Sequence, residues 1–152
     1  MGLTRTYPID TALQLEDGAG PHTSTFVGSG GILDLGAGST TVGAVVLQLS
    51  ALLVSDDNET YKVELQGSPD ADFGTAANNV VLSMLHLGAH EVTNAVFADT
   101  GTDTPTGVYY IPFANDFAGT SYRYVRLKFT IGGTTASITC TAFLTTGMHL
   151  GS

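Results

Sequence analysis

Hydrophobic and polar side chains alternate with a period of two over three separate stretches of the chain. The stretches are residues 61–66, 124–131 and 138–144. This period is that of a β-strand with one face buried and the other exposed. The apolar positions of the three stretches therefore define a predicted core. That core comprises Val63, Leu65, Val125, Leu127, Phe129, Ile138, Cys140 and Leu144.

The second and third stretches are joined by a connection that opens with Gly132 and Gly133. Two alternating runs on either side of a glycine-rich turn are typical of a β-hairpin. We therefore expect these two strands to pair with each other.

Several further strands are predicted around these three. Residues 45–54 and 80–87 are nearly continuous apolar runs, which are typical of strands inside a sandwich. Residues 108–113 carry the aromatic and β-branched side chains that strands favour, and Pro112 marks the end of that strand or a sheet edge. A short strand is expected at residues 32–35. No stretch shows helical spacing, so the sequence predicts an all-β sandwich of jelly-roll type with about seven or eight strands.

The first 31 residues differ from the rest of the chain. Residues 1–31 have few paired apolar positions and include a loose, glycine-containing tract over 18–31. We expect an extended N-terminal arm that becomes ordered against a partner. The predicted organisation is an arm at 1–31, a sandwich domain at 32–147 and a tail at 148–152, since 152 residues fit one domain.

Charge excludes two classes of partner. The chain has five basic and fourteen acidic residues, a net charge of −9, whereas nucleic acids and anionic membranes attract basic surfaces. Only 12% of the residues are charged, about half the usual share, which favours a surface buried in an assembly. We expect a homo-oligomer, most simply a twofold dimer. No secretion signal is visible at the start of the chain, so synthesis in the cytoplasm is expected.

Two motifs suggest site chemistry, and neither holds up in its context. Asp99-Thr100-Gly101 is the tripeptide of aspartic proteases, but it lies in a polar run that predicts a loop. His86 and His90 have the spacing of two zinc ligands on a helix, but they follow an apolar strand. We therefore expect no enzyme activity and no catalytic residue.

Acidic turns supply too few oxygen ligands for a predicted calcium site. Asp56, Asp57 and Glu59 in one turn, and Asp99 and Asp103 in another, lack the ligand ladder of a calcium loop. No metal and no cofactor is expected. Cys140 stands alone in the chain, so no intrachain disulfide is possible.

Most of the positive charge lies in one short segment that also contains tyrosine. The candidate partner-binding residues are Tyr122, Tyr124, Arg126 and Lys128, with Arg123 beside them. Arginine with tyrosine is a mixture that anchors interfaces. Outward basic residues on a strand also commonly pair with carboxylates on the neighbouring strand. Both interpretations stay open.

Residues 32–38, 61–74 and 119–127, in this order, resemble the jelly-roll capsid cement proteins of tailed bacteriophages. The similarity extends over most of residues 32–144. It implies a jelly roll that decorates the exterior of the virion capsid, binds the major capsid protein, forms a homodimer and reinforces the shell. The family brings no catalytic residue to this chain.

A second resemblance supplies the alternative function. Residues 122–127 are also similar to a strand of discoidin-type jelly rolls, which bind sugars or lipids through their loops. That implies a carbohydrate-binding module, although such modules usually present Trp, and this chain has none. A retroviral-type aspartic protease is the third hypothesis.

Overall fold

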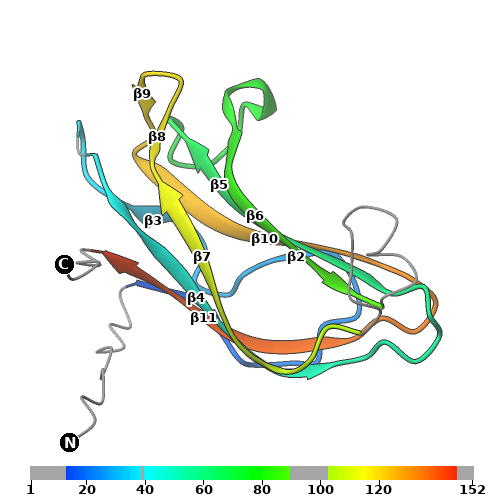
Figure 1. Ribbon diagram of the computed structural model, residues 1–152. Coiled ribbons are helices and arrows are strands. Elements are labelled where there is room, and N and C mark those ends of the chain that lie inside the picture. Colours follow the sequence, from blue (N-terminus) through cyan, green and yellow to red (C-terminus); the bar gives the residue numbers. More distant parts are fainter. Residues whose placement is uncertain (1–12, 39, 90–102, 147–152) are drawn as a thin grey trace, which may run out of the picture.

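The computed structural model describes residues 13–38, 40–89 and 103–146, and antiparallel strands form almost all of their regular structure (Figure 1). One turn of 3-10 helix, Ala76–Asn78, is the helical element of this described part. The strands are β1 (Gln14–Asp17), β2 (Phe26–Val27), β3 (Leu33–Asp34), β4 (Val42–Leu52), β5 (Thr60–Ser68), β6 (Val80–Gly88), β7 (Gly107–Ala114), β8 (Asp116–Phe117), β9 (Thr120–Ser121), β10 (Tyr124–Gly132) and β11 (Ile138–Thr146).

Two sheets pack against each other as the layers of a sandwich (Figure 1). One has four strands in the order β1-β11-β4-β7, and the other has five, in the order β2-β10-β5-β6 with β3 also on β10. The pairing is nested: β5 pairs with β6, β4 with β7, β10 with β2 and β3, and β11 with β1. The predicted all-β sandwich is confirmed.

The core between the sheets contains every residue that the alternation predicted. All eight predicted positions are at most 1% exposed. Val45 and Leu47 of β4 and Ile111 of β7 belong to the same core and are also buried. Burial of this apolar surface drives folding, at about 25 cal/mol per Å². Residues 13–31 also contribute, because Leu15 is fully buried.

The predicted hairpin between β10 and β11 is wrong. β10 pairs with β5 in the five-stranded sheet, whereas β11 pairs with β4 in the four-stranded sheet. Alternation marks only a strand with one buried face, and both strands have one because they face each other across the core. Residues 133–137 carry the chain from one layer to the other.

The prediction of an arm as far as residue 31 is also wrong for the residues that the structure describes. β1 pairs with β11 and β2 with β10, so the segment crosses from one sheet to the other. Glycine permits the close approach: a Cβ at Gly28 would lie 2.1 Å from the Leu15 carbonyl oxygen, and one at Gly30 would lie 1.8 Å from that of Gln14. Strands this short leave little periodicity to read. Residues 1–12 and the predicted tail at 148–152 lie outside the described residues.

Candidate functional site: the outer face of the five-stranded sheet

Three of the four predicted binding residues point away from the core on β10. Tyr124, Arg126 and Lys128 alternate with the buried core residues of the same strand. In the register with β5, Arg126 lies opposite Gln66 and Lys128 lies opposite Glu64. The strand pattern therefore places these three side chains on one face, the outer face of the five-stranded sheet.

Tyr122 does not join them, because it precedes the strand. Its N–H donates to the Asn115 carbonyl oxygen at 2.8 Å, and its own carbonyl accepts from Asn115 Nδ2 at 3.0 Å. A Cβ at Gly67 would lie 3.0 Å from Tyr122 Cβ, and Gly67 shares the inward side of β5 with Leu65. Tyr122 thus packs at the end of the sandwich and is not part of the outer face.

Arg126 is held by contacts within the chain. Its Nε donates to Gln66 Oε1 at 3.0 Å, and its guanidinium carbon lies 4.3 Å from the centre of the Phe73 ring. Phe73 is only 6% exposed and belongs to the connection between β5 and β6, where it adopts a positive φ of 55°. This cation–π contact fixes the connection to the sheet, so Arg126 has a structural role here.

Lys128 differs from the other lysine of this face, Lys62, because Lys62 has an ion-pair partner. Lys62 Nζ lies 3.0 Å from Glu64 Oε1, and Gln66 Nε2 donates to the second oxygen of Glu64 at 3.3 Å. Glu64 is 6% exposed, so its carboxylate is enclosed by these partners. Lys128 has no hydrogen bond or ion pair to another described residue. Its charge is therefore available to a partner molecule.

Arg123, one residue before β10, is paired with a carboxylate of β3. Its Nε and Nη2 each donate to a different oxygen of Asp34 at 2.7 Å. This hydrogen bonding, with a further bond from the Gly36 N–H, lowers the pKa of Asp34 to about 2. The charges of Arg123 and Asp34 therefore compensate each other.

The other sequence motifs form no reactive site in the described residues. His86 lies in the strand β6 and not on a helix, while His90 and Asp99-Thr100-Gly101 lie outside the described residues. Nowhere in residues 13–38, 40–89 and 103–146 do three or more His, Cys, Asp or Glu side chains gather as a metal site would require. Burial raises the pKa of the Cys140 thiol to about 12, which leaves it protonated at neutral pH.

Two carboxylates of the acidic turn before β5, those of Asp56 and Glu59, accept hydrogen bonds from within the chain. Glu59 is fully buried and accepts the Asp56 N–H at 3.1 Å and the Thr135 hydroxyl at 3.3 Å. Thr135 also donates to Asp56. These oxygen atoms stabilise the turn.

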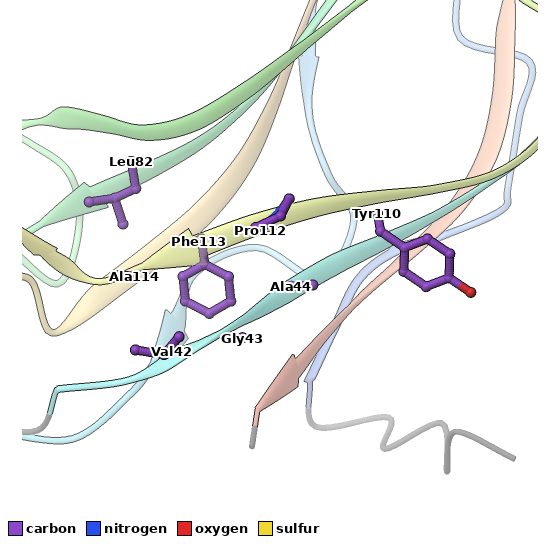
Figure 2. A pocket seen from close by; sticks show the side chains of 8 residues that line it. All are labelled: Val42, Gly43, Ala44, Leu82, Tyr110, Pro112, Phe113 and Ala114. Carbon is purple, nitrogen blue, oxygen red and sulfur yellow. The ribbon is translucent and has the colours of Figure 1, made fainter. Parts of the chain in front are cut away.

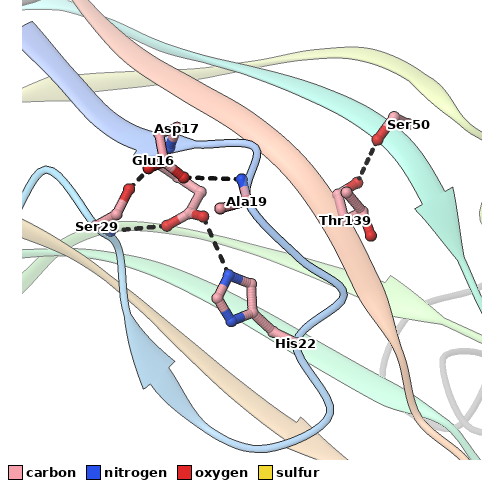
Figure 3. A network of polar contacts seen from close by, with 7 residues as sticks. All are labelled: Glu16, Asp17, Ala19, His22, Ser29, Ser50 and Thr139. Carbon is pink, nitrogen blue, oxygen red and sulfur yellow. Dashed lines mark hydrogen bonds and ion pairs between the residues drawn. The ribbon is translucent and has the colours of Figure 1, made fainter.

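A buried polar cluster around Glu16 was not predicted from the sequence (Figure 3). Glu16 is fully buried; one carboxylate oxygen lies 3.1 Å from His22 Nε2, and the other accepts the Ser29 N–H at 2.7 Å. The His22 ring stacks on Phe26 at 3.7 Å, and Phe26 stacks on Phe129 of β10 at 4.5 Å. The cluster fastens the segment between β1 and β2 to the core. Its residues follow no periodic spacing, so no sequence signal pointed to it.

An apolar pocket lies where β4 and β7 approach Leu82 of β6 (Figure 2). Its volume is about 370 Å³. Its lining residues are Val42, Gly43, Ala44, Leu82, Tyr110, Pro112, Phe113 and Ala114.

Comparison with protein families and with curated proteins gives no relative for this chain. No protein-family model matches the sequence, and no curated protein is significantly similar to it. Across the described residues, no helix has the length and apolar character needed to cross a lipid bilayer.

Proposed function

We propose that this chain is a structural protein that binds the outer surface of a viral capsid and reinforces the shell. The observation that carries the proposal is the outer face of the five-stranded sheet, where Lys128 stands uncompensated among described residues and Tyr124 lies on the same strand face. The resemblance of residues 32–144 to capsid cement proteins supplies the class of partner, the major capsid protein.

We infer the jelly-roll subclass from the nesting of the strand pairs. The first strand, β1, lies beside the last, β11, and the innermost pair is β5 with β6. Winding one long antiparallel hairpin into two layers produces this nesting, which is the arrangement expected of a double-sheet jelly roll. The nesting supports the resemblance to capsid cement proteins.

A cement protein gains strength from many modest contacts that the shell repeats by symmetry. Such contacts need a stiff presenting surface more than a deep pocket. β10 provides that surface, because its inward residues Val125 and Leu127 are fully buried. The Lys128 ammonium then faces an acidic part of the shell, and salt weakens the attachment because exposed charges are screened.

Co-sedimentation with empty heads of tailed phages tests the proposal. We expect the wild-type chain to sediment with one head preparation and the Lys128→Ser variant to bind less, with a weaker dependence on salt. Arg123→Ser is the matched control, because it removes the same charge from a side chain that Asp34 already compensates. Arg126 is left unchanged, since its loss would disturb the Phe73 contact.

Soluble glycans in the same assay test the alternative. Failure to bind any head preparation, together with saturable binding to one glycan, would favour the carbohydrate-binding module. Equal losses in Lys128→Ser and Arg123→Ser would contradict the role given to the outer face of the five-stranded sheet.

A further inference from the structure

The apolar pocket between β4, β7 and Leu82 of β6 has no part in the proposed attachment to a shell (Figure 2). Apart from Leu82, its lining comes from the four-stranded sheet, whereas Lys128 lies on the five-stranded sheet. None of its lining residues is Asp, Glu, Lys or Arg. With a volume of about 370 Å³, it has the size and chemistry of a small-molecule site, since such sites measure about 300–1,000 Å³ and are mostly apolar.

Small side chains keep the pocket open. In the register of β4 with β7, Gly43 lies opposite Phe113 and Ala44 lies opposite Pro112. A side chain at Gly43 is excluded, because a Cβ there would lie 1.9 Å from the carbonyl oxygen of Thr145. The close packing of β4 on β11 therefore leaves part of the lining to the backbone, and Ala44 adds only a methyl group beside it.

The pocket has a deep part and an exposed rim. Ala44 is 1% exposed and Phe113 is 5% exposed, whereas Tyr110 is 51% exposed and Val42 is 64% exposed. The hydroxyl of Tyr110 points away from the other lining residues, so its ring contributes to the lining (Figure 2). A ligand can therefore enter past the rim and leave water as it reaches the deep part.

The lining residues restrict the class of ligand. A charged ligand would lose its water and find no opposite charge among them, which is costly. The rings of Tyr110, Pro112 and Phe113 offer flat apolar surfaces, and aromatic groups pack on aromatic rings in stacked or edge-to-face geometry. A flexible alkyl chain would lose more conformational freedom on binding than a rigid ring system. An uncharged aromatic molecule therefore fits the lining best.

We propose that this pocket binds an uncharged aromatic small molecule of two or three rings. The volume of the pocket sets that size, because an apolar cavity of about 150 Å³ holds one benzene molecule and this pocket has more than twice that volume. Binding here does not depend on attachment to a shell, so it can be tested on the isolated chain.

Fluorescence titration of the full chain with N-phenylnaphthylamine tests the inference, since this uncharged aromatic probe brightens when it leaves water. We expect saturable binding of one probe molecule per chain. Naphthol should displace the probe, whereas naphthoate, which carries the same rings with a negative charge, should not. Decanol should displace it at least about tenfold more weakly than naphthol, because decanol is flexible.

A variant that fills the pocket shows where the probe binds. Ala114→Leu places a larger side chain in the lining and should weaken probe binding at least about tenfold, because it occupies space that the rings need. Ala114 is the last residue of β7 and is partly exposed, so the fold should tolerate the change. Ala51→Leu is the matched control, since it makes the same change at an exposed position of β4 outside the lining.

Circular dichroism shows which variants keep the β fold. If Ala114→Leu does not fold, Val42→Asp replaces it, because it adds a charge at the exposed rim. A wild-type chain that binds no probe saturably would overturn the inference. So would equal binding by the folded pocket variant and Ala51→Leu, or displacement by naphthoate or decanol that is as strong as displacement by naphthol.

Discussion

The two outer faces of the sandwich cover the same core and yet differ in almost every outward side chain. β5 and β10 carry Lys62, Glu64, Arg126 and Lys128, whereas β4, β7 and β11 carry no charged residue. Inward chemistry is alike in the two sheets, because both must exclude water from one core. The difference shows that one core constrains the inward positions of both sheets, whereas the outward positions of the two sheets differ in charge.

The largest effect is expected from a comparison of two neighbouring substitutions on β10, one on its inward side and one on its outward side. Leu127→Ala should lower the free energy of unfolding by about 2–5 kcal/mol, because a fully buried side chain leaves a cavity. Lys128→Ser, one residue away on the outer side, should change it by less than about 0.5 kcal/mol. Urea denaturation measures the free energy of unfolding of both variants. Similar losses in the two would show that Lys128 also contributes to the stability of the fold.

The Glu16 cluster belongs to neither outer face, so its loss should affect the sandwich as a whole. Glu16→Ala leaves the Ser29 N–H and the His22 ring without their carboxylate, and we expect a loss of about 1–3 kcal/mol. Glu16→Gln retains an acceptor and should lose less. Hydrogen exchange of the Ser29 amide, faster in Glu16→Ala, identifies the cause. Unchanged exchange at that amide would contradict the assignment.

A substitution of Arg126 tests whether this residue, unlike Lys128 on the same face, contributes to the stability of the fold. Arg126→Ala should cost about 1 kcal/mol, through the lost contacts with Phe73 and Gln66. A Phe73→Leu background should remove part of that cost, which a double-mutant cycle in denaturant measures. Additive losses in the cycle would show that the two side chains are not coupled.

The smallest effect concerns the exposed pair of Arg123 and Asp34. The pKa of Asp34 is lowered from 3.8 to about 2, so the pair stabilises the fold above pH 4. That contribution is lost as the pH falls from about 4 to 2. Asp34→Asn should therefore be less stable than the wild type at pH 6 and approach it at pH 2 to 3. A stability difference that does not change with pH would contradict the ion pair.

Sequence reasoning was accurate where one periodic signal decides the outcome. It identified the eight core positions, the longer β strands and the outward direction of Tyr124, Arg126 and Lys128, since alternation alone fixes the two sides of a strand. It failed for the β10–β11 hairpin, because alternation does not say which sheet a strand joins. It also missed β1, β2 and the contacts of Arg126 with Phe73, which depend on segments far apart in the chain.

The most direct test of the account compares the co-sedimentation of Lys128→Ser and Arg123→Ser with phage heads. We predict that Arg123→Ser binds like the wild-type chain, because Asp34 already compensates the charge that it removes. Lys128→Ser should stay folded in circular dichroism and lose most of its attachment to the heads. Equal binding by the two folded variants would contradict the account.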